Sequence, residues 1–152
     1  MQLFLRSSLI LALIFVGRCH ATCFQNRDEL AQAVSDYLGD NSPDTEVAKA
    51  YGWPIGTWCV SDVTDFSDIF MNAVDFNEDL SQSDTSRATT MRGMVLTASS
   101  FDQPLSSWNV ASVEDMRLMF LGALVFNQDL STWDVSNVET IESMFFGAAA
   151  FN

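Results

Sequence analysis

The sequence has almost no histidine, and this scarcity restricts the chemistry it can perform. The single histidine, His20, falls in an N-terminal stretch that we interpret below as a signal peptide. Ser-His-Asp and Cys-His catalytic arrangements need an imidazole as their base. A pair of carboxylates can also catalyse hydrolysis, but the acidic clusters of this chain recur at a fixed period, as scaffold residues do. We therefore expect a protein that is not an enzyme.

Basic residues are also few. Lys and Arg total 7 against 20 Asp and Glu, for a net charge of −13 at pH 7. Such a chain is repelled by the phosphates of nucleic acid and by anionic lipid surfaces. The acidity is compatible with a solvated surface or with a basic or cation-bridged partner. We therefore expect no nucleic-acid partner.

Long hydrophobic runs are missing as well. The longest near the N-terminus, Leu9–Val16, is far shorter than the ~20 residues that span a bilayer. Arg6 precedes it and Cys19-His20-Ala21 follows, which is the order of a secretory signal and its cleavage site. We predict a signal peptide at residues 1–21, a secreted or cell-surface location, and no membrane insertion after its removal. The alternative is an N-terminal core element.

Cysteines are scarce, and only Cys23 and Cys59 lie beyond the predicted signal. In an oxidising compartment they suggest one disulfide, and two free thiols are the alternative. Their spacing, and the position of the single His20 within the predicted signal, exclude an ordinary zinc site. We expect no cofactor and no bound metal.

What the chain does have is a period of 25 residues. The same residue types return in register in at least three columns, namely Phe76, Phe101 and Phe126; Leu80, Leu105 and Leu130; and Met94, Met119 and Met144. One such unit cannot bury its apolar face alone, so a repeat of this length indicates a stacked array. We predict a repeat region at residues 51–152, with coils at 51–75, 76–100, 101–125 and 126–150 and the start of a fifth at Phe151.

Residues 22–50 do not match the repeat and are predicted to form an N-terminal helical cap. Asn26 and Glu29 have the spacing of a capping box, and Gly39 follows as a stop signal. Apolar residues between them recur at helical spacing, for example Leu30 and Val34. The amphipathic helix would cover the apolar end of the array.

Within each repeat the pattern predicts one extended segment and one helix. Phe126–Ser131 has apolar ends and a polar middle, which favours a strand. Ser136 and Glu139 resemble a second capping box, and apolar residues at helical spacing follow it up to Gly147. We therefore predict an α/β, leucine-rich-repeat-like solenoid of about four 25-residue coils with an N-terminal helical cap.

The coil at 76–100 departs from its neighbours. Ser83 stands in the column of Trp58, Trp108 and Trp133, and Val95 stands where the later coils have phenylalanine. A missing buried aromatic can cost ~3–5 kcal/mol if its space stays empty. We expect Ser83→Trp with Val95→Phe to stabilise the fold.

The repeats FNQDLSTWDVSNVETIESMFFGA (Phe126–Ala148) and FDQPLSSWNVASVEDMRLMFLGA (Phe101–Ala123) resemble the BspA-like leucine-rich-repeat family of surface proteins. The same repeat domain occurs in many mycoplasma surface lipoproteins. The resemblance implies a secreted or surface-displayed protein, with some members linked to adhesion and host-protein binding. Arg18 and Thr22 before Cys19 and Cys23 do not form a lipobox, so lipid anchoring is not expected.

Solvent-facing positions between the apolar columns are the candidate binding surface. These positions are Asn77, Glu78, Asp79, Asp102, Gln103, Asn127, Gln128 and Asp129, with Ser107 and Thr132 beside them. We expect a protein-binding or adhesion module whose partner is an extracellular protein or glycan. The alternative is a structural component of an extracellular coat or matrix, which self-associates through its uncapped C-terminal coil.

Two further columns admit two interpretations each. Asp84, Asn109 and Asp134 could ligate calcium between coils, but we expect them to accept backbone N–H groups in the turns. Met71, Leu121 and Phe146 lie off the apolar columns, so they either form an exposed stripe or pack on a neighbouring coil.

Overall fold

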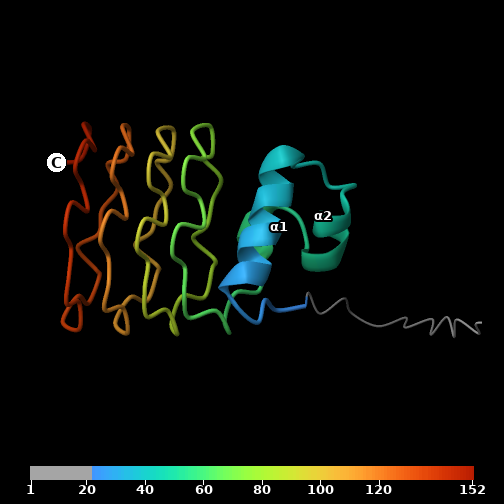
Figure 1. The fold of residues 1–152 in the computed structure, drawn as a ribbon, viewed down its shortest axis with the longest axis horizontal. Helices are drawn as coiled ribbons and strands as arrows, with labels where there is room; N and C mark the ends of the chain where they lie inside the picture. Colours follow the sequence, from blue (N-terminus) through green and yellow to red (C-terminus); the bar gives the residue numbers. More distant parts are fainter. Residues whose placement is uncertain (1–21) are drawn as a thin grey trace, which may run out of the picture.

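The computed structural model describes residues 22–152, so the predicted signal peptide lies outside the described residues. The chain begins with helix α1 (Arg27–Gly39), helix α2 (Glu46–Tyr51) and a 3₁₀ turn η1 (Ile55–Thr57). The rest winds into flat coils stacked side by side, with α1 at one end of the stack and the last coil at the other (Figure 1).

Helix α1 begins at a capping box and packs on the first coil. Asn26 Oδ1 accepts the N–H of Glu29 at 3.0 Å, and Glu29 Oε2 accepts the N–H of Gln25 at 2.8 Å. The buried face of the helix consists of Leu30, Ala33, Val34 and Tyr37. The apolar spacing in the sequence therefore forms a helix that covers the end of the stack.

The predicted α/β leucine-rich-repeat solenoid is wrong. Within residues 22–152 the structure has only two short α-helices and no strand or sheet. The expected helix after Ser136 and the expected strand at Phe126–Ser131 are absent; both segments are turns and irregular backbone. Isolated parallel bridges join Asp65 to Thr90, Thr90 to Asp115, and Asp115 to Thr140.

Residues with left-handed backbone prevent the helix. Each coil has two of them four positions apart, namely Asp68 and Asn72, Gly93 and Thr97, Leu118 and Gly122, and Ser143 and Gly147. A right-handed α-helix cannot continue through φ > 0. Short turns replace it, with N–H groups bonding three residues back, as from Met119 to Met116 (3.3 Å) and Leu121 to Leu118 (3.1 Å). The three-residue spacing of apolar side chains that resembled a helix belongs to these turns.

The N–H groups between the turn bonds hold neighbouring coils together. Met116, Leu118, Phe120 and Gly122 each donate to the carbonyl 24 residues later, at 2.9–3.0 Å. The two preceding coils repeat this arrangement at equivalent positions. In this hydrogen-bond ladder all N–H groups point toward the last coil and all carbonyls point toward α1.

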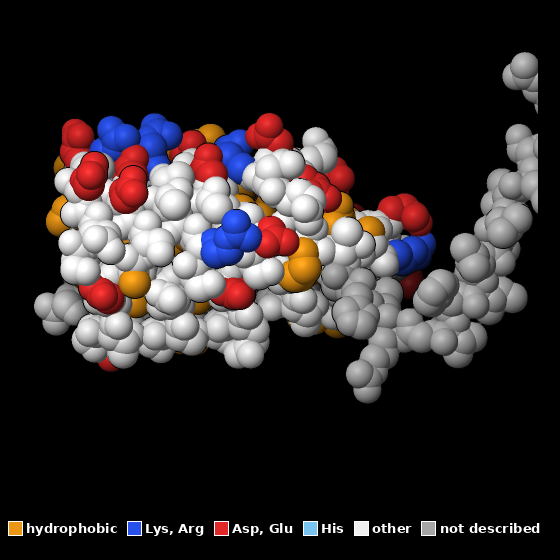
Figure 2. Space-filling view, turned by 90° about the horizontal axis from the view of Figure 1, so that it is seen from below, with side chains coloured by type: hydrophobic (Ala, Val, Ile, Leu, Met, Phe, Trp, Pro, Cys, Tyr) orange, Lys and Arg blue, Asp and Glu red, His pale blue; other side chains and the backbone are white. Residues whose placement is uncertain are grey.

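Aromatic side chains form the centre of the stack. The rings of Phe76, Phe101, Phe126 and Phe151 are stacked at centroid separations of 5.9, 6.1 and 5.9 Å. The indole N–H of Trp108 donates to the carbonyl of Leu80 in the preceding coil at 2.9 Å. Outside this core, the face in Figure 2 is mostly polar, with hydrophobic side chains in small patches.

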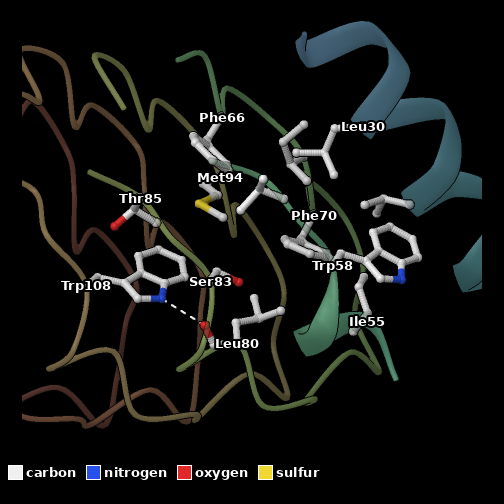
Figure 3. A pocket seen from close by; sticks show the side chains of 13 residues that line it. Leu30, Ile55, Trp58, Phe66, Phe70, Leu80, Ser83, Thr85, Met94 and Trp108 are labelled. Atoms are coloured by element: carbon white, nitrogen blue, oxygen red, sulfur yellow. Dashed lines mark hydrogen bonds between the residues drawn. The ribbon is translucent and has the colours of Figure 1, made fainter. Parts of the chain in front are cut away.

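The missing tryptophan of the second coil leaves a small cavity. It lies between Trp58 and Trp108, with Ser83 on its wall (Figure 3). Its volume is only ≈ 20 Å³, and Leu30 and Val34 of α1 also line it. The cavity therefore holds at most about one water molecule.

Candidate binding site

A groove of ≈ 480 Å³ lies where the end of α1 meets the first two coils. Tyr37, Leu38 and Asn41 line it from the cap, and Asn72–Glu78 line it from the coils. It therefore brings together segments more than thirty residues apart in the sequence. Two of the predicted surface residues, Asn77 and Glu78, belong to it.

Two hydrogen-bond donors from the cap hold the Glu78 carboxylate in the groove. The hydroxyl of Tyr37 donates to Glu78 Oε2 at 2.6 Å, and Asn41 Nδ2 donates to Oε1 at 3.4 Å. Burial, followed by this bond to a carboxylate, raises the pKa of Tyr37 to about 12. The phenol therefore remains a donor at neutral pH, and the Glu78 carboxylate is held in one orientation.

The remaining wall offers polar and apolar contacts to a ligand. Asp75 is exposed, and in residues 22–152 no side chain forms an ion pair with it. Asn72 Oδ1 accepts the hydroxyl of Thr97 at 2.6 Å. Leu38 and Val74 are 44% and 50% exposed. Two carboxylates beside amide groups and exposed apolar surface can bind a basic side chain or the hydroxyls of a sugar.

Most of the other predicted surface residues join coils to one another. Asn77 Oδ1 accepts the N–H of Asp102, Asp102 Oδ1 accepts the N–H of Asn127, and Asn127 Oδ1 accepts the N–H of Asn152, at 2.9–3.1 Å. Further bonds in the same direction come from Gln103, Ser107, Gln128 and Thr132. These residues recur with the 25-residue period because each coil makes the same hydrogen bonds to its neighbour.

The acidic columns form turns. Asp84, Asn109 and Asp134 accept the N–H two residues later at 3.0–3.1 Å, and Asp79 and Asp129 do the same at 2.8 Å. The N–H and hydroxyl of Ser81 lower the pKa of Asp79, and those of Ser131 lower that of Asp129. In the described residues no three His, Cys, Asp or Glu side chains form a group that could hold a metal ion.

A disulfide ties the cap covalently to the first coil ahead of α1. Cys23 and Cys59, 36 residues apart, form a disulfide in the structure, where the sequence left free thiols open. The N–H of Phe24 also donates to the carbonyl of Cys59 at 3.0 Å. These bonds fix the start of the cap on the first coil.

Sequence reasoning missed Tyr37, Asn41, Asn72 and Asp75 as groove residues. A signal for two of them exists in the repeat columns. Asn72 aligns with Gly122 and Gly147, and Asp75 aligns with Val125 and Ala150. Polar residues confined to the coils nearest the cap indicate a local role that the repeat itself does not require.

The match to known proteins covers the stack and the end of the cap. A family model described as "Mycoplasma protein of unknown function, DUF285" matches residues 41–152. The chain belongs to this family. No curated protein and no solved structure matches it. This match fits the BspA-like resemblance of the repeats only loosely and does not confirm it.

In this DUF285 chain an exposed apolar column runs along the stack. Its members are Met71, Leu96, Leu121 and Phe146; Met71 is 46% exposed and Phe146 73%, and the two leucines are half-buried. The column is therefore partly an exposed stripe and partly packed between coils, because its two leucines are half-buried and Met71 and Phe146 are exposed.

No helix among residues 22–152 has the length and apolarity to cross a membrane.

The last coil of the DUF285 stack has an open apolar face. Ile141 is 62% exposed, whereas Met116 in the same column is 1% exposed. Val135 is 53% exposed, whereas Val110 is 1% exposed. The face has a hollow of ≈ 520 Å³ lined by Leu130, Trp133, Val135, Ile141 and Phe145, among others.

Proposed function

We propose that this protein is a secreted or cell-surface binding module, and that it recognises an extracellular protein or glycan through the groove between α1 and the first two coils. The observation that carries the proposal is the fixed Glu78 carboxylate beside the exposed Asp75. A preorganised acidic group loses little freedom when a ligand binds. The module would bind without turnover.

Charge and composition favour a basic group on the partner. The chain has a net charge of −13, which favours long-range attraction of a cationic partner. Leu38 and Val74 add apolar surface next to the carboxylates. A lysine or arginine beside an apolar residue on a partner protein would match this combination.

Membership of the DUF285 family and the predicted signal peptide support the surface location. The family is described from Mycoplasma, and the BspA-like resemblance of the repeats extends this to adhesion.

A screen of residues 22–152 against arrays of extracellular proteins and glycans tests the function. The matched variants are Glu78→Gln, which keeps an acceptor for Tyr37, and Asp44→Asn, which removes an equal charge from an exposed position of the cap outside the groove. We expect retention on a ligand that Glu78→Gln weakens and Asp44→Asn does not. If no ligand is retained, or if both variants bind as the unmodified chain does, the groove has no recognition role.

A further inference from the structure

The tips of the coils beside the end of α1 carry exposed aliphatic side chains. These tips are residues 71–75, 96–100 and 121–125, and they lie along the upper edge of the stack in Figure 1. We call these side chains the tip ridge; its members are Met71, Val74, Leu96, Leu121, Leu124 and Val125. Four of them are 46–51% exposed, and Leu96 and Leu121 are half-buried. A contiguous apolar surface of this kind marks an interaction site more often than single exposed residues do.

Backbone hydrogen bonds place the ridge residues of successive coils side by side. The N–H of Asn72 donates to the carbonyl of Leu96 at 2.8 Å, and the N–H of Thr97 donates to the carbonyl of Leu121 at 2.7 Å. Neighbouring coils are therefore one step of ~4.8 Å apart at the tips. Each of the three coils that form the ridge is followed by a further coil, so these residues are exposed along the side of the stack.

The tip ridge is continuous with the acidic groove. Val74 belongs to the ridge and also lines the groove, next to Leu38 of α1 and the carboxylates of Asp75 and Glu78. From Val74 the ridge extends over two further coils to Leu124, a distance of ~10 Å at ~4.8 Å per coil. An acidic pocket and an aliphatic ridge therefore form one surface.

The chemistry of this surface favours a protein ligand over a sugar. Two carboxylates complement the cation of a lysine or arginine side chain. Aliphatic side chains pack well against the apolar side chains of a protein, whereas the hydroxyls of a sugar would lose their hydrogen bonds to water there. A sugar ring would instead stack on an exposed aromatic residue such as Trp53, which is 51% exposed and does not belong to the ridge. Its indole N–H donates to the carbonyl of Asn41 at 2.8 Å.

We propose that the groove and the tip ridge together bind a segment of a partner protein that carries a lysine or arginine and, about three residues away, an apolar side chain. An extended chain advances ~3.3 Å per residue, so about three residues span the ~10 Å between Val74 and Leu124. The basic side chain pairs with Asp75 and Glu78, and the apolar side chain packs on Leu121 and Leu124. This inference rests on the proposed function and names the class of its ligand.

The test is selection of a phage-displayed library of random short peptides on residues 22–152, followed by calorimetric titration of the selected peptides. We expect the selected peptides to share a basic residue and an apolar residue about three positions apart. The groove variant is Asp75→Asn with Glu78→Gln, and it should raise Kd by about tenfold or more.

The ridge variant is Leu124→Ser with Val125→Ser. It copies Ser99-Ser100, which occupy the same positions in the preceding coil, so the fold of the tip accepts it without a change of charge. We expect this variant also to raise Kd by about tenfold or more, since it removes apolar surface that the peptide buries. Val135→Ser changes a 53% exposed apolar residue outside the ridge and the groove, and it should leave Kd unchanged.

Each alternative outcome overturns the inference in a recognisable way. If only the groove variant weakens binding, the groove recognises the partner and the ridge has no part in it. If only the ridge variant does, the proposed function of the groove fails as well. Selection of no peptide, or of peptides without the basic and apolar pair, removes the assigned ligand. Retention of a glycan that Trp53→Ala abolishes and the ridge variant does not would make the ligand a sugar.

Discussion

The hydroxyl of Tyr37, on the cap, and the carboxylate of Glu78, on the second coil, form a 2.6 Å hydrogen bond across 41 residues of sequence. This bond joins the two parts of the molecule at the groove. Since Tyr37 is 1% exposed, its ionisation would place a buried phenolate beside a carboxylate.

We expect stability to decrease at high pH because of this pair. The pKa of Tyr37 is raised from 10.0 to about 12 in the folded chain, so the contribution is fully present below pH 10 and is lost as pH rises toward 12. Denaturant unfolding of the unmodified chain and of Tyr37→Phe between pH 8 and 12 measures it. Equal pH dependence in the two proteins would contradict the assignment.

Gly56 has no room for a side chain. A Cβ there would lie 2.1 Å from the carbonyl oxygen of Asp79 in the next coil, whereas a Cβ on Gly39 meets nothing within 4 Å. We expect Gly56→Ala to lower the free energy of unfolding by at least ~2 kcal/mol, because backbone must move to relieve the contact. Gly39→Ala, measured by the same urea unfolding, should change it by no more than ~1 kcal/mol. Similar effects of both substitutions would show that the coils are not packed this closely.

The structure changes the expectation for Ser83. Because the cavity beside it is only ≈ 20 Å³, an indole does not fit between Trp58 and Trp108. We now expect Ser83→Trp to destabilise the fold by ~1–3 kcal/mol through overpacking. Ser83→Ala is the control for loss of the hydroxyl. A rise in melting temperature for Ser83→Trp would mean that α1 can move away from the first coil.

Asp102 joins two coils through its carboxylate. It accepts the N–H of Asn127 at 2.9 Å and the amide of Gln128 at 2.8 Å. We expect Asp102→Ala to cost ~1–2 kcal/mol in chemical denaturation, as the loss of hydrogen bonds to a charged acceptor does. Gln82→Ala, at an exposed site whose side chain hydrogen-bonds to its neighbour Ser81, should have almost no effect. If Asp102→Ala leaves the free energy of unfolding unchanged, this carboxylate does not stabilise the contact between the two coils.

The sequence was sufficient to predict α1 and the 25-residue period, because capping and apolar spacing are local signals. It was insufficient for the backbone of the repeat. Leu118 and Ser143 have φ values of 61° and 55°, and neither residue type signals a left-handed conformation. Bonds to the neighbouring coil impose that conformation, as at Leu118, whose N–H donates to Glu142 at 3.0 Å.

The site was predictable only in part, for a related reason. Asn77 and Glu78 were identified as polar positions between apolar columns, and the structure places both in the groove. Tyr37 lies on the buried face of the cap helix, but its hydroxyl reaches a partner that no local pattern reveals. The remaining polar columns recur because each turn and each coil contact needs the same acceptor.

Binding of the partner by the acidic groove is tested most directly by measuring the affinity of groove variants for it. Binding of the ligand retained in the array screen would be measured by calorimetry at low and high salt. The proteins are the unmodified chain, the double variant Asp75→Asn with Glu78→Gln, and Asp44→Asn. We predict that the double variant raises Kd by about tenfold or more and that its Kd depends less on salt. Asp44→Asn should leave Kd unchanged. Equal affinity for all three proteins would contradict the account and place recognition elsewhere on the stack.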